Sequence, residues 1–237
     1  MARLGINIEE IAALRDLRYA KTPDPVTAAV FIEVGGADGI VCPLNDAMRP
    51  IQERDLRLLR EAVKTHFNLQ LPPTGKLMTL AFNVAPDMIT LVGGKKDSSS
   101  SAGGLDVMAQ TEELSRIVKE IRAQDIVVAV QIEPSIHQVK AAAKVGADYV
   151  EFHLGKLSNA KDLNDRTDIL DTLRSVVLAA AKMDLGVAAG QGVTYQNAGE
   201  IAAMEKMEEL NVGHAVISRA LWVGMEQAVR DMAALMQ

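Results

Sequence analysis

The residues of this sequence that could transfer protons lie near the ends of short apolar runs. Glu151 and His153 are two residues apart, so in a strand their side chains share one face. A carboxylate beside an imidazole is a plausible acid/base pair, although a hydrogen-bonded structural pair explains the spacing equally well. Glu9 and Glu10 are adjacent after the first apolar run, and strand geometry would point them in opposite directions. At most one of them would then face a common pocket. We take Glu10 as a candidate acid or base and Glu9 as a candidate ligand-binding residue, and a solvated or helix-capping carboxylate is the alternative for either.

Anion binding is a second chemistry that the residue types suggest, near the end of the chain. The stretch 185–219 reads as two strands, 185–190 and 211–217, which carry Gly190-Gln191-Gly192 and Gly213-His214. Backbone N–H groups freed by glycine beside the N-terminus of a helix attract phosphate. Tight strand-to-helix turns would explain the same glycines equally well. The pattern predicts a small phosphorylated ligand, provided that the fold brings the two glycine turns together.

Other catalytic chemistries have little support in the sequence. The four histidines lack metal-binding spacing and there is one cysteine, so we expect no metal site. We find no nucleophile elbow for a serine hydrolase and no dinucleotide fingerprint after the first strand, and we expect no cofactor. Cys42 lies in an apolar run and is interpreted as an inert core thiol.

Composition narrows the class of protein further. Hydrophobic residues make up 49% of the 237 residues but aromatic residues only 3%, so the core must be aliphatic, as in parallel sheets covered by helices. A net charge of −6 argues against a nucleic-acid or membrane partner. Apolar runs stay short of the ~18 residues that a membrane span needs, and we find no secretory signal. We therefore expect a cytoplasmic protein.

The elements that would position these residues alternate along the chain. The segments 28–41 and 139–152 resemble each other, each reading as a helix, a glycine turn with Ala-Asp, and a strand. On this template we predict strands at 3–8, 38–42, 67–71, 88–92, 126–132, 148–153, 185–190 and 211–217. Helices are predicted at 24–35, 53–66, 74–84, 109–123, 135–145, 166–183, 195–205 and 219–236. Eight such units predict one α/β domain over residues 1–237, a (β/α)₈ TIM barrel, whose active site would lie where the strands end.

Two long loops follow predicted strands at that end. The loop 93–104 is rich in glycine, serine and lysine and follows the fourth strand. We interpret it as a lid that closes over a phosphate, with a plain solvated loop as the alternative. The loop 43–52 follows the second strand and is restricted by two prolines.

Several motifs together resemble the pyridoxine 5′-phosphate synthase family over nearly the whole chain. They include Gly5-Ile6-Asn7-Ile8, Pro23-Asp24-Pro25-Val26, Gly36-Ala37-Asp38-Gly39-Ile40, Gly103-Gly104-Leu105-Asp106-Val107, Glu151-Phe152-His153 and Leu210-Asn211-Val212-Gly213-His214-Ala215. The resemblance implies a (β/α)₈ barrel with extra helices that forms a homo-oligomer, usually an octamer. It also implies condensation of 3-amino-2-oxopropyl phosphate with 1-deoxy-D-xylulose 5-phosphate beneath a loop after the fourth strand.

The resemblance implies roles for individual residues, and some of these positions are substituted. Ligand-binding positions that match are Asn7, Arg18, Gly192, Gly213 and His214, and Ser101 keeps the hydroxyl of a lid threonine. The catalytic positions differ: Glu9-Glu10 replaces an Asp-His pair, Pro43 and Pro50 replace histidines, Asn45 an arginine, Gln70 a glutamate and Gln191 a histidine. Glutamine cannot exchange a proton near neutral pH, and the loss of one general base costs about 10²–10⁴-fold in rate.

Three functions remain open on the sequence. The chain is a divergent enzyme that performs another condensation, elimination or isomerisation on a phosphorylated ketone or amino ketone. Alternatively, it is a non-catalytic paralogue that binds a phosphorylated metabolite or joins the true synthase as a subunit. In the third reading it forms pyridoxine 5′-phosphate with a rearranged set of groups. Retention of polar residues at positions 9 and 10 favours a site that is still active.

Overall fold

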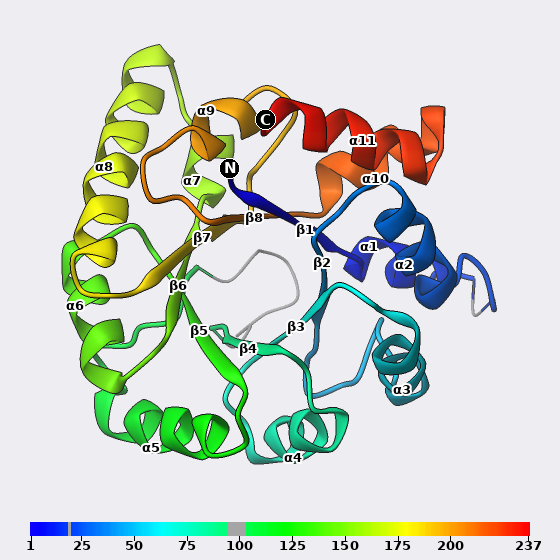
Figure 1. Ribbon diagram of the computed structural model, residues 1–237, viewed down its shortest axis with the longest axis horizontal. Coiled ribbons are helices and arrows are strands. Elements are labelled where there is room, and N and C mark those ends of the chain that lie inside the picture. Colours follow the sequence, from blue (N-terminus) through cyan, green and yellow to red (C-terminus); the bar gives the residue numbers. More distant parts are fainter. Residues whose placement is uncertain (19, 94–102) are drawn as a thin grey trace.

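The computed structural model describes residues 1–18, 20–93 and 103–237, and its centre is a closed barrel of eight parallel strands (Figure 1). The strands pair in chain order and β8 closes on β1. Their bounds are β1 Arg3–Asn7, β2 Gly39–Pro43, β3 His66–Leu71, β4 Met88–Leu91, β5 Val127–Ile132, β6 Tyr149–His153, β7 Gly186–Gly190 and β8 Glu209–Val212. The predicted (β/α)₈ barrel is therefore confirmed.

Helices form the outer ring of the barrel. They are α1 Glu9–Asp16, α2 Pro25–Val34, α3 Glu53–Ala62, α4 Gly75–Val84, α5 Thr111–Arg122, α6 Ile136–Val145, α7 Gly155–Ser158, α8 Leu163–Ala181, α9 Ala198–Ala202, α10 His214–Val223 and α11 Met225–Leu235. The two similar segments adopt the expected form, since α2 is followed by Gly36 at φ 95° and α6 by Gly146 at φ 83°. A left-handed residue at this point favours glycine and turns the chain into the next strand.

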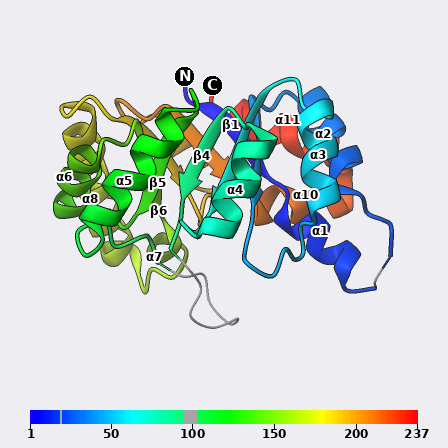
Figure 2. The same ribbon diagram turned by 90° about the horizontal axis from the view of Figure 1, so that it is seen from below.

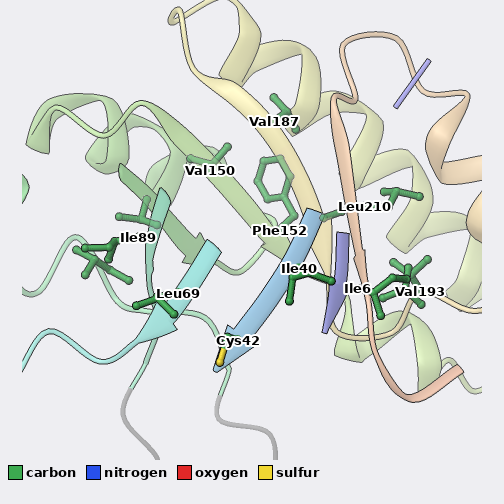
Figure 3. Close-up of a cluster of buried hydrophobic side chains, with 14 of the residues drawn as sticks. Ile6, Ile40, Cys42, Leu69, Ile89, Val150, Phe152, Val187, Val193 and Leu210 are labelled. Carbon is green, nitrogen blue, oxygen red and sulfur yellow. The ribbon is translucent and has the colours of Figure 1, made fainter. Parts of the chain in front are cut away.

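Alternation along each strand separates an apolar outer face from a polar inner face. Ile6, Ile40, Leu69 and Phe152 are fully or almost fully buried and belong to the core between strands and helices (Figure 3). Cys42 lies in this same layer, where burial raises the pKa of its thiol, so the expected inert role is consistent with its position. The neighbours of these residues along each strand face the barrel axis, and many of them are polar.

The region after the first strand differs from the prediction, because the helix α1 begins there. β1 ends at Asn7, and Glu9 and Glu10 form the first turn of a helix instead of continuing the strand. The Asn7 side-chain oxygen accepts a hydrogen bond from the Glu9 N–H at 2.9 Å, which satisfies one free donor of the helix start. The argument that strand geometry separates the two glutamates was therefore wrong.

The last strand and helix also differ from the prediction. β8 ends at Val212, and α10 begins at His214, so residues 214–217 are helical. Gly224, at φ 83°, separates α10 from α11, where the pattern had suggested one helix over 219–236. The helix after β7 is also shorter than predicted, because α9 spans only five residues. A run of apolar residues does not distinguish a buried strand from the buried side of a helix.

A buried ion pair ties α1 to α3. Both terminal nitrogens of Arg15 donate to the Asp55 carboxylate, at 2.8 and 2.7 Å, and Arg15 also donates to the Pro50 carbonyl. Asp55 in turn accepts from the Gln52 N–H at the start of α3. Arg15 is 4% exposed and Asp55 is fully buried, so this pair is shielded from water.

The two ends of the barrel carry different segments. Figure 2 shows both chain termini at one end, with α1 and α7, which follow β1 and β6, toward the opposite end. The predicted lid at 93–104, including Ser101, lies largely outside the described residues, which stop at 93 and resume at 103. Within the described part of the chain, the helices are too short or too polar to cross a membrane.

Candidate functional site

A pocket of ≈ 270 Å³ opens where the barrel strands end. Its lining combines acidic, amide and hydroxyl side chains with glycines: Asn7, Glu9, Glu10, Gln70, Glu151, Ser158, Gln191, Gly192, Val193, Thr194, Asn211, Gly213, His214 and Ala215. These residues come from β1, β3, β6 and β8, from α1, the end of α7 and the start of α10, and from the turn after β7. The C-terminal end of the strands is where TIM barrels hold their active sites.

Glu151 lines this pocket, is almost fully buried, and is held by three side-chain amides. Its Oε1 accepts from Gln131 at 2.7 Å and its Oε2 from Asn211 at 2.7 Å. Gln70 donates to both oxygens, at 3.1 and 3.0 Å. The donors come from β5, β8 and β3, so the carboxylate joins four strands across the barrel axis.

Burial raises the pKa of Glu151 to about 6, and the three amide donors act against that increase. The nearby charge of Glu209 raises the pKa further. A carboxyl group with a pKa near 6 is present in both protonation states around neutral pH, which general acid/base catalysis requires. Glu151 thus has the environment of a proton-transfer group.

Glu10 is a second carboxylate of the pocket, and it is half-buried. Burial raises its pKa, the adjacent Glu9 adds to the increase, and His214 opposes it. Its Oε2 has no hydrogen-bond partner among the described residues, although the atom is buried. Helix geometry lets both Glu9 and Glu10 line the pocket. An unpartnered carboxylate oxygen that faces a pocket is available to a ligand.

The glycine turns predicted to bind an anion do come together here. Gly192 follows β7 with φ 124°, and a Cβ at this position would lie 2.5 Å from the Leu154 carbonyl oxygen. Gly213 is the N-cap residue of α10, and a Cβ added there would lie 3.1 Å from Glu10 Oε2. The free N–H groups at the start of α10 therefore border the same pocket as Glu10, with space that only glycines leave. His214 is exposed and its Nε2 is 3.3 Å from Ser218 Oγ.

His153 is separated from the pocket lined by Glu151, although both lie on one face of β6. Its Nδ1 is 3.5 Å from Glu133 Oε1, and Glu133 also pairs with Lys156 at 2.9 Å. Burial lowers the pKa of His153, so the neutral imidazole is favoured. The proposed Glu151–His153 pair thus shares a strand face, but each side chain has other partners.

The remaining sequence candidates fall into two groups. Gln70, Gln191, Asn7 and Gly192 line the pocket, whereas the pocket lining in the described chain does not include Arg18, Asn45 or Pro43. Arg18 is exposed just beyond α1, and Asn45 donates its side-chain amide to the Arg49 carbonyl. Sequence reasoning missed Gln131 and Asn211. Their polar side chains at inward positions of otherwise apolar strands were the available signal.

Comparison with known proteins gives matches over the whole chain. The family model of "Pyridoxal phosphate biosynthesis protein PdxJ" matches residues 4–237. A protein of Geobacter metallireducens named pyridoxine 5′-phosphate synthase is 42% identical over 237 residues, covering 100% of this chain and 99% of its own length. A protein of the same name from Thermosynechococcus vestitus is 45% identical over 235 residues, covering 99% of both chains.

Solved structures show the same architecture at low sequence identity. The 3-keto-L-gulonate-6-phosphate decarboxylase of Vibrio cholerae aligns with a TM-score of 0.67 at 14% identity, over 99% of this chain and 97% of its own. The thiamine phosphate pyrophosphorylase of Pyrococcus furiosus aligns with a TM-score of 0.65 at 16% identity, over 99% and 95%. These similarities concern the fold alone.

Proposed function

Because the chain belongs to the pyridoxal phosphate biosynthesis protein PdxJ family, we propose that it is an enzyme acting on a small phosphorylated ketone or amino ketone. One observation carries this proposal: the buried carboxylate of Glu151 and the half-buried carboxylate of Glu10 line the same pocket as the glycine-bordered start of α10. The helix start suits a phosphate group, and the carboxylates suit proton transfer to and from the rest of the ligand.

The carboxylates also favour an amino ketone over a simple ketone. Glu9, Glu10 and Glu151 place three acidic side chains in one pocket, and Glu10 has a buried oxygen without a partner among the described residues. An ammonium group would satisfy that oxygen and offset the negative charge. A ligand with a phosphate at one end and an amine near the other matches both parts of the lining.

Proton transfer in this site is assigned to Glu151 and Glu10. Gln70 and Gln191 line the pocket but carry amides, which hold no exchangeable proton near neutral pH. In the proposed step, the Glu151 carboxylate takes a proton from a C–H or N–H of the bound ligand and becomes neutral. It then returns that proton to a departing oxygen. The substituted positions lead us to propose a condensation or elimination that differs from the one implied by the family resemblance.

Two other functions have observations in their favour. Identity of 41–45% over the full chain to proteins named pyridoxine 5′-phosphate synthase favours that same reaction, with Glu151 and Glu10 in new roles. Replacement of proton-transfer groups by Gln70 and Gln191 favours a protein that binds a phosphorylated metabolite without turnover. An assay with 3-amino-2-oxopropyl phosphate and 1-deoxy-D-xylulose 5-phosphate separates these, and negligible product is the result we expect.

A ligand screen that includes charge variants of the pocket tests the anion site. We expect a phosphorylated amino ketone at 100 times its Kd to stabilise the protein by about 2.7 kcal/mol in a thermal-shift assay. Ala215→Glu adds a carboxylate at the first turn of α10, where the helix dipole tolerates it but a phosphate would be repelled. Ala215→Gln is the neutral control of similar size. Affinity should fall at least about tenfold more in the glutamate variant, a difference of ~1.4 kcal/mol, and equal affinities would place the phosphate elsewhere.

We further propose that the protein forms a homo-oligomer through an apolar face on α2 and α10. This face, called here the α2/α10 face, consists of Phe31, Val34, Leu221, Trp222 and Val223, all at least 42% exposed. α2, α10 and α11 lie side by side in both ribbon views (Figures 1 and 2), and Phe31 and Val223 line one groove. Monomeric proteins rarely expose large apolar patches, which mark interaction surfaces.

Trp222→Glu is expected to reduce the oligomer to smaller species, because the 87% exposed indole would lie inside the contact. Light scattering coupled to size-exclusion chromatography measures the particle mass. Leu163→Glu is the matched control, since Leu163 is 79% exposed at the start of α8, away from this face. A monomeric wild-type protein, or an unchanged mass in the Trp222 variant, would contradict the assignment of this face.

A further inference from the structure

We propose that Gln70, Gln131 and Asn211 are positioning residues that hold Glu151 with both oxygens engaged and favour its ionised form. The proposal rests on the proposed function and deepens it. It assigns Gln70 on β3 a role as a hydrogen-bond donor to Glu151. We call these three side chains the amide clamp. Each donates from an NH₂ group, and Gln70 spans both carboxylate oxygens.

The orientation of the clamp follows from the chemistry of the groups. A carboxylate accepts only, so each amide must turn its nitrogen toward Glu151 and its oxygen away. Asn211 shows the consequence, because its Oδ1 is buried without a hydrogen-bond partner among the described residues. The donor contact with Glu151 at 2.7 Å is thus formed at the expense of the other end of the amide.

Two glycines make room for this arrangement. A Cβ on Gly5 of β1 would lie 2.1 Å from Asn211 Oδ1, and a Cβ on Gly190 of β7 would lie 2.8 Å from Glu151 Oε1. Any larger residue would push a member of the cluster out of place. Six strands therefore contribute to this arrangement. The glycines lie on β1 and β7, the hydrogen-bond donors on β3, β5 and β8, and the acceptor Glu151 on β6.

The clamp favours a single protonation state. All four contacts offer hydrogen to Glu151 and none accepts one, so the protonated acid would lose contacts unless an amide turned over. Other titratable groups around Glu151 are Glu209 on β8, which pairs with Arg3 at 3.1 Å, and Glu9, Glu10 and His214, which line the same pocket. His153 on the same strand is directed to Glu133. Burial works against the clamp, and the balance leaves the pKa of Glu151 at about 6.

Direct titration of Glu151 in the ligand-free protein tests the clamp. Carbon-13 NMR of labelled glutamate carboxyl groups follows the signal, and its loss in Glu151→Gln identifies it. Gln70→Met removes one donor group and keeps the volume, so the apparent pKa should rise by about 1–2 pH units. Gln131→Met removes a donor from the other side and should shift the signal in the same direction. In Gln70→Glu two carboxylates face each other, so the pair should titrate in two separated steps.

Asn68→Leu is the matched control for the clamp. Asn68 also lies buried on β3 but accepts from Thr90 at 2.9 Å instead of contacting Glu151, so its removal should leave the titration unchanged. An unshifted signal in both methionine variants would overturn the clamp, as would an equal shift in the control. This titration needs no substrate, so its result tests the amide clamp even if the proposed function is wrong. If the enzyme is active, the acidic limb of its rate profile should move with the NMR titration.

Discussion

Glu151→Gln is expected to lower kcat/KM by about 10²- to 10⁴-fold on whichever phosphorylated substrate the ligand screen identifies. The variant keeps the size of the side chain but replaces the carboxyl group held by the amide clamp, whose own three members are amides that carry no exchangeable proton near neutral pH. Steady-state kinetics measures the loss, and thermal shift with the same ligand measures binding. Binding should be reduced far less than turnover, because the start of α10 is unchanged.

Glu209→Gln provides the matched control. Glu209 is also a buried glutamate of the barrel interior, 4% exposed, but it is not among the residues that line the pocket. Because the charge of Glu209 helps to raise the pKa of Glu151, the two are compared well above pH 6, where Glu151 is ionised in both, and we expect the activity there to stay close to that of the wild type. Activity of Glu151→Gln within about fivefold of the wild type would rule out Glu151 as the proton-transfer group, since the loss of a general base costs at least about 10²-fold.

The pH dependence of stability gives an independent check on Glu151. Its pKa is raised from 4.5 to about 6 in the folded protein, a difference of about 1.5 pH units, or ~2 kcal/mol. A raised folded-state pKa contributes stability below pH 4.5, and this contribution is lost as the pH rises through about 6. Denaturant unfolding measures the free energy of unfolding of the wild type and of Glu151→Gln at pH 4 and pH 7. Relative to the variant, the wild type should be less stable at pH 7 than at pH 4.

Arg15→Met is expected to cost about 3–5 kcal/mol of folding free energy, which lowers Tm by roughly 6–20 °C for a domain of this size. The reason is that Asp55 remains as a fully buried charge. Without Arg15, the interactions left to this carboxylate are the hydrogen bond from the Gln52 N–H and the more distant Arg54 at 3.7 Å. Thermal or urea unfolding measures the change. Because α1 carries Glu9 and Glu10, loosening its attachment to α3 should also disturb the pocket.

A double variant distinguishes a lost ion pair from general damage. In Arg15→Met with Asp55→Leu the isolated charge is gone, so the cost should be smaller than the sum of the two single changes. Some cost remains because Asp55, in the first turn of α3, also accepts from the N–H of the N-cap residue Gln52. Arg57→Met is the surface control: its pair with Glu53 is exposed, and less than about 0.5 kcal/mol is expected. Additive single costs would show that the pair is not coupled.

The sequence by itself determined the architecture and the position of the two glycine turns that we propose bind an anion. Alternation of apolar runs with glycine-ended helical stretches predicted eight βα units, because a buried parallel strand and an amphipathic helix have different periods. The turns at Gly192 and Gly213 could be placed at strand ends for the same local reason, and the structure brings both to one pocket. Local patterns failed where a buried strand and a buried helix have the same apolar composition. Residues 214–217 are an example, because they were predicted as strand and are helical.

The tertiary structure alone decided which polar residues act together. Glu151 was visible from its spacing to His153, yet its partners lie on β3, β5 and β8, far away in the chain. Glu10 reaches the pocket only because Asn7 ends β1 and the chain turns into α1 there. Closure of the barrel sets these distances, since it fixes the register of all eight strands at once, and no local pattern encodes that register.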